Sequence, residues 1–203
     1  MKEMRIRIKF TEDCLGTSPS NTEIYSTYIG SKAPNAQNKE EEIASIGADA
    51  YEEKQKTIFP KLPDGTPFFW DYQIKGFFKD TCSALSRCKG YEHAKASCAL
   101  KAFKKVIDGN IFVFPRKIPI QMPAKSKIGD LQRPLRASTA QGDRVALANS
   151  ETIPAGSCIE MTITNLNDGA QDALIEWLNY GMYKGIGQWR NAGWGRFEWE
   201  ELE

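Results

Sequence analysis

The chain has 203 residues, of which 41% are hydrophobic and 26% are charged, and its formal net charge is +1. This composition is typical of a globular protein with one sizeable core, and it excludes wholesale disorder. The near-neutral charge excludes the strongly basic class of nucleic-acid-binding domains, so any contact with nucleic acid has to come from a local patch.

Several other classes of protein find no support in the sequence. No apolar run of about 18 residues is present and the first ten residues are polar, so we expect an intracellular, cytoplasmic protein without a membrane partner. The five cysteines contain no CxxC pair, which predicts reduced thiols and no metal site or other cofactor. The motifs of P-loop NTPases, zinc proteases and serine hydrolases do not occur.

The first part of the chain predicts a strand followed by irregular and charged segments. Charged and apolar residues alternate over residues 4–10, which indicates a half-buried strand. Cap-type residues predict a short helix at about 20–30, and the charged stretch 31–57 is interpreted as a peripheral insertion. Aromatic residues over 68–74 predict an extended segment in a short hairpin.

The middle of the chain predicts helices and then strands. Apolar residues recur at helical spacing from 77 to 103, and Gly90 divides this segment into two helices. Strands punctuated by prolines are expected at 111–114 and 116–122. The polar residues 124–151 predict a long hairpin, which is a second peripheral insertion.

The last part of the chain completes the pattern. The clearest alternation covers residues 158–164, an amphipathic helix follows at about 170–180, and a final strand is expected at 196–200. A helix between two such strands is half of a ferredoxin-like repeat. We therefore predict an α+β, ferredoxin-like fold, with an antiparallel sheet, helices on one face and inserted hairpins, in a single domain over residues 1–203.

The segment 184–199 has an unusual composition. It contains four glycines, two arginines and three tryptophans within sixteen residues. Glycine allows positive φ and a close approach of the backbone to a ligand, and its exposed N–H groups can hold phosphate oxygens, to which arginine adds a forked donor.

This segment resembles the C-terminal glycine-rich loop of the RAMP superfamily of CRISPR proteins. In that superfamily a helix leads into a pattern like G-x-G-x-x-R-x-x-G-x-G-R, and the final strand follows. The matching positions are Gly185, Gly187, Arg190, Gly193, Gly195 and Arg196. The resemblance implies an RRM-like form of the ferredoxin-like fold and RNA contacts through these residues and Lys184.

A second segment, residues 72–80, resembles the backbone-subunit branch of the same superfamily, in which a glycine and a basic residue open the first long helix. Positions 77 and 78 are phenylalanine here, whereas that branch has small serines. The resemblance implies that Lys75, Gly76 and Lys79 face the RNA backbone near a helix N-terminus.

For each of these features a structural explanation stays open beside the functional one. Arg5 and Arg7 form one face of the first strand, which either carries RNA backbone or packs against a helix through the aliphatic stems. The glycine-rich segment is either an RNA grip or a tight hairpin, and Trp189 and Trp194 either stack on bases or fill the core. The basic residues between 125 and 144 belong either to a finger over nucleic acid or to a solvated hairpin tip.

Three functions remain as hypotheses. The first is a non-catalytic, RAMP-like protein of antiviral defence that binds single-stranded RNA of the guide type, together with other effector-complex subunits or copies of itself. The second is a protein-interaction module of viral (phage) origin that engages or mimics a CRISPR effector subunit, and the near-neutral charge favours it. The third is a RAMP-type endoribonuclease that uses His93, the one histidine of the chain, as general acid or base.

Overall fold

The computed structural model describes residues 1–19, 56–139 and 142–203, including all of their side chains except those of residues 19 and 134–147. The helix expected at 20–30 and most of the insertion expected at 31–57 lie outside the described residues.

The chain divides into two compact units. The first consists of Met1–Cys14, Pro60–Lys127 and Ile153–Glu203, and the second of Leu15–Phe59 and Ile128–Thr152. Each unit is described by itself below.

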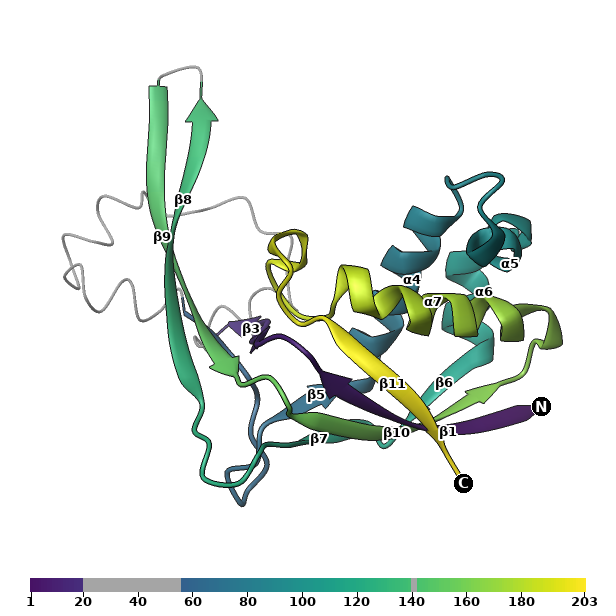
Figure 1. Ribbon diagram of the computed structural model, residues 1–203, viewed down its shortest axis with the longest axis horizontal. Helices are drawn as coiled ribbons and strands as arrows, with labels where there is room; N and C mark the ends of the chain where they lie inside the picture. Colours follow the sequence, from purple (N-terminus) through teal and green to yellow (C-terminus); the bar gives the residue numbers. More distant parts are fainter. Residues whose placement is uncertain (20–55, 140–141) are drawn as a thin grey trace. The chain divides into compact units, whose positions relative to one another are not determined.

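The first unit is built on an antiparallel sheet with the strand order β11-β1-β10-β7-β5 (Figure 1). Its strands are β1 (Lys2–Phe10), β5 (Phe68–Trp70), β6 (Ile111–Phe114), β7 (Lys117–Gln121), β10 (Cys158–Asn165) and β11 (Phe197–Leu202). β7 pairs with the start of β10, and β6 pairs with its second half. β6 and β7 therefore share one position in the sheet.

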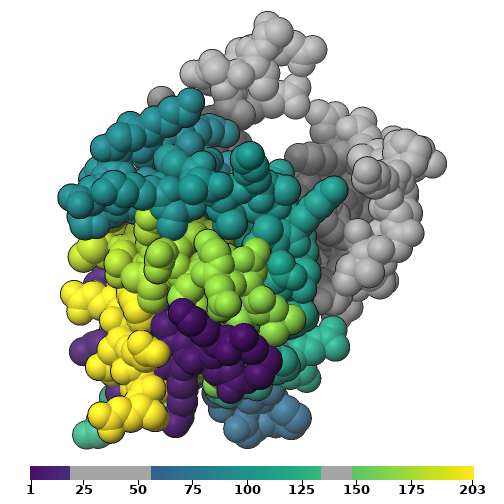
Figure 2. All heavy atoms as spheres, turned by 90° about the vertical axis from the view of Figure 1, so that its right-hand side faces the viewer, coloured from purple at the N-terminus to yellow at the C-terminus, as the bar shows by residue number. Residues whose placement is uncertain are grey.

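Helices cover one face of this sheet (Figure 1). They are α4 (Asp71–Leu85), α5 (Lys95–Ala99), α6 (Phe103–Asn110) and α7 (Gln171–Lys184), with the short 3-10 helices η1 (Glu92–Ala94), η2 (Asp168–Ala170) and η3 (Arg190–Ala192). Figure 2 shows α7 between the segment that carries α5 and α6 and the ends of β1 and β11. Over the described part of the chain, no helix is long and apolar enough to cross a membrane.

The order of these elements is that of a ferredoxin-like fold. Apart from the short edge strand β5, which precedes α4, β1 is followed by helices from α4 on, then by β6 and β7, and then by β10, α7 and β11. The first and third strands of this order, β1 and β10, are neighbours in the sheet. This βαββαβ order with helices on one face confirms the predicted fold class.

Alternation along the strands explains why the helices cover one face only. In β1 the apolar residues are 0–4% exposed, whereas the charged residues between them point to the opposite face. The buried side chains of the central strands meet those of α4 and α7 in one core, and its members include Ile6, Ile8, Phe10, Ile159, Ile163, Phe77, Phe78, Trp177 and Phe197. Each such side chain contributes roughly 1.5–3 kcal/mol by leaving water.

The start of α4 differs from the expectation. The helix begins at Asp71, so the extended segment predicted for 68–74 is wrong beyond Trp70, and the helix start predicted at 77 is wrong by six residues. The N–H of Trp70 donates to Oε1 of Gln73 at 2.7 Å, which satisfies a donor at the helix start. Ile74 also stands three residues before Phe77 on the buried side of the helix, so the helical spacing starts earlier than expected.

The second unit contains the predicted long hairpin. β8 (Gly129–Thr139) and β9 (Gly142–Ile153) pair antiparallel from Gly129 opposite Thr152 to Thr139 opposite Gly142 (Figure 1). The short strands β2 (Cys14–Leu15), β3 (Ser18–Pro19) and β4 (Thr57–Ile58) complete a sheet of order β2-β9-β4-β3. The inserted hairpin of the predicted fold class is thereby confirmed.

Candidate nucleic-acid interface

The glycine loop, defined as residues 185–196, joins α7 to β11 and closes on itself. The N–H of Ile186 donates to the carbonyl of Gly195, and the N–H of Gly195 donates to the carbonyl of Asp13, each at 2.8 Å. The thiol of Cys14 donates to the carbonyl of Ile186 at 3.4 Å. The loop is thus a hydrogen-bonded structure held against the end of β1.

The glycines of this loop have conformations that other residues rarely adopt. Gly185, Gly187, Gly193 and Gly195 have φ of 72°, 91°, 91° and 69°. A Cβ on Gly195 would lie 1.9 Å from the carbonyl oxygen of Ile186, and a Cβ on Gly185 would lie 2.4 Å from that of Trp194. Close packing within the loop therefore requires these two glycines before any ligand is considered.

The two arginines of the loop and Lys184, the last residue of α7, differ in how they are paired. Arg190 Nη1 lies 2.9 Å and Lys184 Nζ 3.5 Å from Oδ2 of Asp80, which belongs to α4. Arg196 is exposed, and its Nε donates to the carbonyl of Tyr183 at 3.2 Å. Lys184 and Arg190 thus tie the loop to α4, whereas Arg196 presents its guanidinium at the surface.

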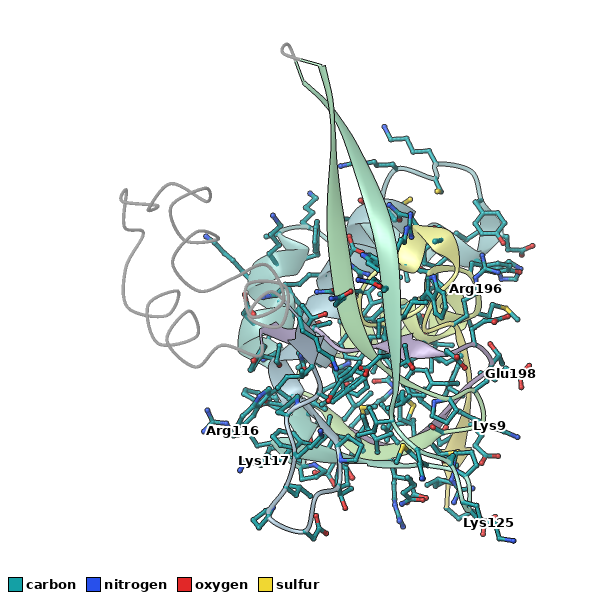
Figure 3. The ribbon with its side chains drawn as sticks, turned by 90° about the vertical axis from the view of Figure 1, so that its left-hand side faces the viewer. Lys9, Arg116, Lys117, Lys125, Arg196 and Glu198 are labelled. Atoms are coloured by element: carbon teal, nitrogen blue, oxygen red, sulfur yellow. The ribbon has the colours of Figure 1, made fainter. Side chains whose placement is uncertain are left out.

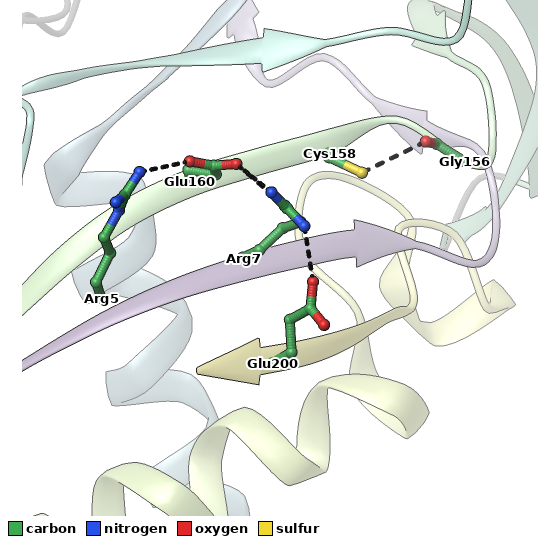
Figure 4. Close-up of polar contacts among 6 residues, drawn as sticks. All are labelled: Arg5, Arg7, Gly156, Cys158, Glu160 and Glu200. Carbon is green, nitrogen blue, oxygen red and sulfur yellow. Dashed lines mark hydrogen bonds and ion pairs between the residues drawn. The ribbon is translucent and has the colours of Figure 1, made fainter. Parts of the chain in front are cut away.

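The arginines of β1 lie on the sheet face opposite the helices, in a network of ion pairs (Figure 4). Arg5 lies 3.1 Å and Arg7 2.8 Å from carboxylate oxygens of Glu160, and Arg7 also lies 2.9 Å from Glu200. The hydrogen bonds from Arg7 and then Arg5 hold the pKa of Glu160 below its ordinary value, and those from Glu160 and Glu200 raise the pKa of Arg7. This face is therefore balanced in charge rather than basic.

A shallow depression of about 560 Å³ adjoins this network. Two cations, Arg7 and Lys9, and two carboxylates, Glu198 and Glu200, line it. The side chains of Arg5 and Arg7 are 57% and 41% exposed to solvent. They therefore do not pack against a helix, which was the structural alternative for this face of the strand.

The group around Lys75 lies inside α4 rather than at its start. Lys75 is in the second turn of α4, where its Nζ donates to the carbonyl of Asp108 at 3.1 Å, and Lys79 pairs with the Asp108 carboxylate at 2.5 Å. Gly76 has open space where a Cβ would stand. Because the helix begins at Asp71, the expected position of Lys75 and Lys79 near a helix N-terminus is wrong.

The other residues singled out in the sequence are half-buried or exposed. Trp189 and Trp194 are both half-buried. His93 is exposed in η1, with its ring 5.4 Å from that of Tyr91, and lines a depression of about 220 Å³. Arg136 and Arg144 of the predicted finger lie outside the described side chains.

Sequence reasoning missed a cluster of cations and aromatic rings at the β5 edge of the sheet. Arg116 and Lys117 project there side by side, at the margin opposite to Lys9 and Glu198 (Figure 3). Both lie over the ring of Trp70, at 5.7 and 5.6 Å from its centroid. The adjacent Arg116 and Lys117 were the local signal for such a surface, but the rings beneath them, Phe68 and Trp70, come from a distant part of the chain.

The cysteines and the other possible metal ligands form no metal site among the described residues. All five cysteines are free thiols. Burial raises the pKa of the Cys82 thiol to about 11, so that thiol stays protonated near neutral pH. The described residues contain no group of three or more His, Cys, Asp and Glu side chains that could hold a metal ion.

Comparisons with known proteins support the fold. Neither the protein-family models nor the curated protein sequences match this chain. A chain of the cryo-EM structure of the type III-B Cmr-beta complex bound to cognate target RNA matches at a TM-score of 0.51 and 12% identity, over 100% of this chain and 60% of that chain. A chain of a type IV-B CRISPR complex matches at a TM-score of 0.48 and 12% identity, over 99% of this chain and 90% of that one. The present chain thus has a fold similar to that of a CRISPR effector chain, while spanning three fifths of the length of its Cmr-beta counterpart.

Proposed function

We propose that this protein is a non-catalytic, RAMP-like subunit of a CRISPR effector complex, and that it binds single-stranded RNA. The glycine loop carries the proposal. It combines four positive-φ glycines with an exposed Arg196 at the junction of the last helix and the last strand. The second unit is, on this proposal, an insertion into a single RAMP-like domain.

The chemistry of the loop suits a phosphodiester backbone. Gly193 has no side chain, and a Cβ there would stand 3.4 Å from the guanidinium carbon of Arg196, so the cation can lie close over the loop backbone. A guanidinium with exposed donors forms charge-assisted, forked hydrogen bonds to phosphate oxygens. The fixed shape of the loop lowers the entropy lost when a strand binds.

The fold comparison supports the proposed class of partner. The matched Cmr-beta chain belongs to a complex bound to target RNA. The match covers 100% of the present chain and 60% of the Cmr-beta chain. RNA and other effector subunits, or copies of this chain, are therefore the proposed partners. Lys184 and Arg190 shape the loop through Asp80, and Arg196 makes the contact.

The test is fluorescence anisotropy of a labelled single-stranded RNA with wild type and Arg196→Glu. We expect salt-sensitive binding that the charge reversal weakens by about tenfold or more, because each phosphate contact releases counterions. Arg87→Glu is the matched control, since Arg87 is an exposed arginine just beyond α4. Equal affinity of the two variants would contradict an RNA contact at the glycine loop.

One observation favours the second hypothesis, a module that engages or mimics an effector subunit. Arg5, Arg7, Lys79 and Arg190 are all paired with carboxylates, so much of the candidate surface has no excess charge. Absence of RNA binding by folded wild type, together with association with an effector complex in a pull-down, would replace our proposal with this one.

A further inference from the structure

Two groups of cations on the sheet of the first unit differ in their partners. Those of the sheet centre are held by carboxylates, whereas those at the β5, β6 and β7 edge are held by aromatic rings. Lys117 lies 5.5 Å from the centroid of Phe68 and 5.6 Å from that of Trp70, and Arg116 lies 5.7 Å from that of Trp70. On the neighbouring strand β6, Phe112 lies 5.2 Å below Nζ of Lys75. We call Phe68, Trp70, Tyr72, Arg116 and Lys117 the edge cluster.

This kind of contact leaves the positive charge in place. A ring attracts a cation through its quadrupole and adds no negative charge, whereas a carboxylate neutralises its partner. Within the described residues, neither Arg116 nor Lys117 forms an ion pair with a carboxylate, and both are exposed. Asp71, the acid next to the cluster, accepts the N–H of Tyr72 on its Oδ1 at 2.9 Å. The edge cluster thus has two exposed positive charges, neither of which is paired with a carboxylate among the described residues.

The rings of the cluster also pack against one another. The rings of Trp70 and Tyr72 are stacked, with centroids 6.1 Å apart and planes at 17°. Phe68 meets Trp70 edge to face at 5.0 Å, which fixes the Trp70 ring from the side. Tyr72 is 52% exposed. An unpaired base can stack on an exposed ring such as that of Tyr72 or on the guanidinium plane of Arg116.

The ligand that fits both properties is a single strand of nucleic acid. Phosphates can bind to Arg116 and Lys117, and unpaired bases can stack on the exposed ring of Tyr72. The bases of a duplex cannot stack there in this way, because they are already stacked on one another. The cluster lies at β5, the opposite edge of the sheet from β11, which the glycine loop precedes. At about 4.8 Å between neighbouring strands, the two edges stand roughly 19 Å apart.

We propose that the edge cluster is a second RNA-binding site, in which Arg116 and Lys117 contact phosphates and Tyr72 stacks on a base. This inference rests on the proposed RNA binding and adds a contact that the glycine loop does not supply. A strand that reaches both edges of the sheet is bound at two points.

The test uses the full chain and two labelled probes of equal length, an oligouridine and an abasic ribose-phosphate strand. Arg116→Gln with Lys117→Gln is expected to lower the steepness of log affinity against log salt by about 1.4, from two lost phosphate contacts. Tyr72→Ala is expected to weaken binding of oligouridine by roughly five- to 150-fold and to leave the abasic strand unaffected. The control is Arg87→Gln with Lys89→Gln, which removes the same two charges from an exposed turn.

The outcomes separate this inference from the proposed function. If the edge variants bind RNA like the control while Arg196→Glu binds it weakly, the edge site is overturned and the glycine-loop contact stands, and the edge is then a surface for an acidic protein. Equal wild-type affinity for the two probes overturns base stacking at Tyr72. No RNA binding by folded wild type overturns both proposals.

Discussion

Arg7 shows how single residues set the properties of the open sheet face. It donates to Glu160 through Nε and Nη2 and to Glu200 through Nη1, and these partners stand on the strands on either side of β1. A carboxylate whose pKa is lowered by folding stabilises the folded state above its unfolded pKa, and this stability is lost as the pH falls through the folded pKa. Glu160 is such a group.

Replacement of Glu160 tests this network. Glu160→Gln is expected to be slightly less stable than wild type at neutral pH and to lose less stability on acidification, because the lowered pKa of Glu160 no longer contributes. Urea unfolding at neutral pH and at a pH below the ordinary pKa of glutamate measures the difference. The effect is small, since exposed ion pairs are screened by water and salt. An identical pH dependence for the two proteins would show that the network adds nothing to stability.

The same variant has a second readout. Arg5 and Arg7 lose a shared negative partner in Glu160→Gln, so RNA affinity at low salt is expected to rise if RNA reaches this face. An unchanged affinity would exclude the β1 face from the RNA-binding surface.

At the scale of elements, the glycine loop is specified by its own packing. Its hydrogen bonds to Asp13 and its closure by Ile186 and Gly195 need a backbone that passes within van der Waals distance of itself. Gly181 of α7 belongs to the same arrangement, because a Cβ there would lie 2.1 Å from the ring of Phe197. Small residues therefore set the distance between α7, the loop and β11.

Gly195→Ala tests the loop. Gly195 has a φ of 69°, and an alanine with this φ destabilises the folded state by about 1–2 kcal/mol. The clash of its Cβ with the Ile186 carbonyl lowers the stability further. Gly65→Ala is the matched control, since Gly65 also has positive φ, at 86°, but has open space where a Cβ would stand. Denaturant unfolding should therefore show a larger loss for Gly195→Ala than for Gly65→Ala. Equal losses would mean that the loop can shift to make room.

At the scale of the whole molecule, the two compact units carry different kinds of structure. The core residues of the ferredoxin-like sheet and helices belong to the first unit, whereas the long β8 and β9 hairpin belongs to the second. All five tryptophans of the chain, including the buried Trp177, are in the first unit. Tryptophan fluorescence therefore reports on the first unit alone.

Shortening the hairpin tests whether the first unit is stable by itself. Replacement of residues 133–148 by a two-residue turn is expected to leave the unfolding free energy measured by tryptophan fluorescence within about 0.5 kcal/mol of wild type, as for surface changes that leave the core intact. Circular dichroism of the same samples checks that the strand signal falls. A large loss in the fluorescence transition would show that the hairpin is part of the folding unit.

The sequence by itself determined the class of fold and the place of the unusual loop. The alternation in β1 and β10, the apolar stripe of α7 and the glycine pattern after it are local signals, because strand and helix periods repeat over a few residues. These signals were sufficient for a ferredoxin-like order with an inserted hairpin. They also located the glycine loop, whose four glycines all have positive φ.

Only the tertiary structure decided which cations are available to a ligand. Arg7 meets Glu160, 153 positions away, through the register of β1 and β10, and Arg190 meets Asp80 through the packing of the loop on α4. Arg116 and Lys117 reach Trp70 because β5 pairs with β7. No local pattern encodes these pairings, since register and packing depend on the whole core, and the charge left on each surface depends on them in turn.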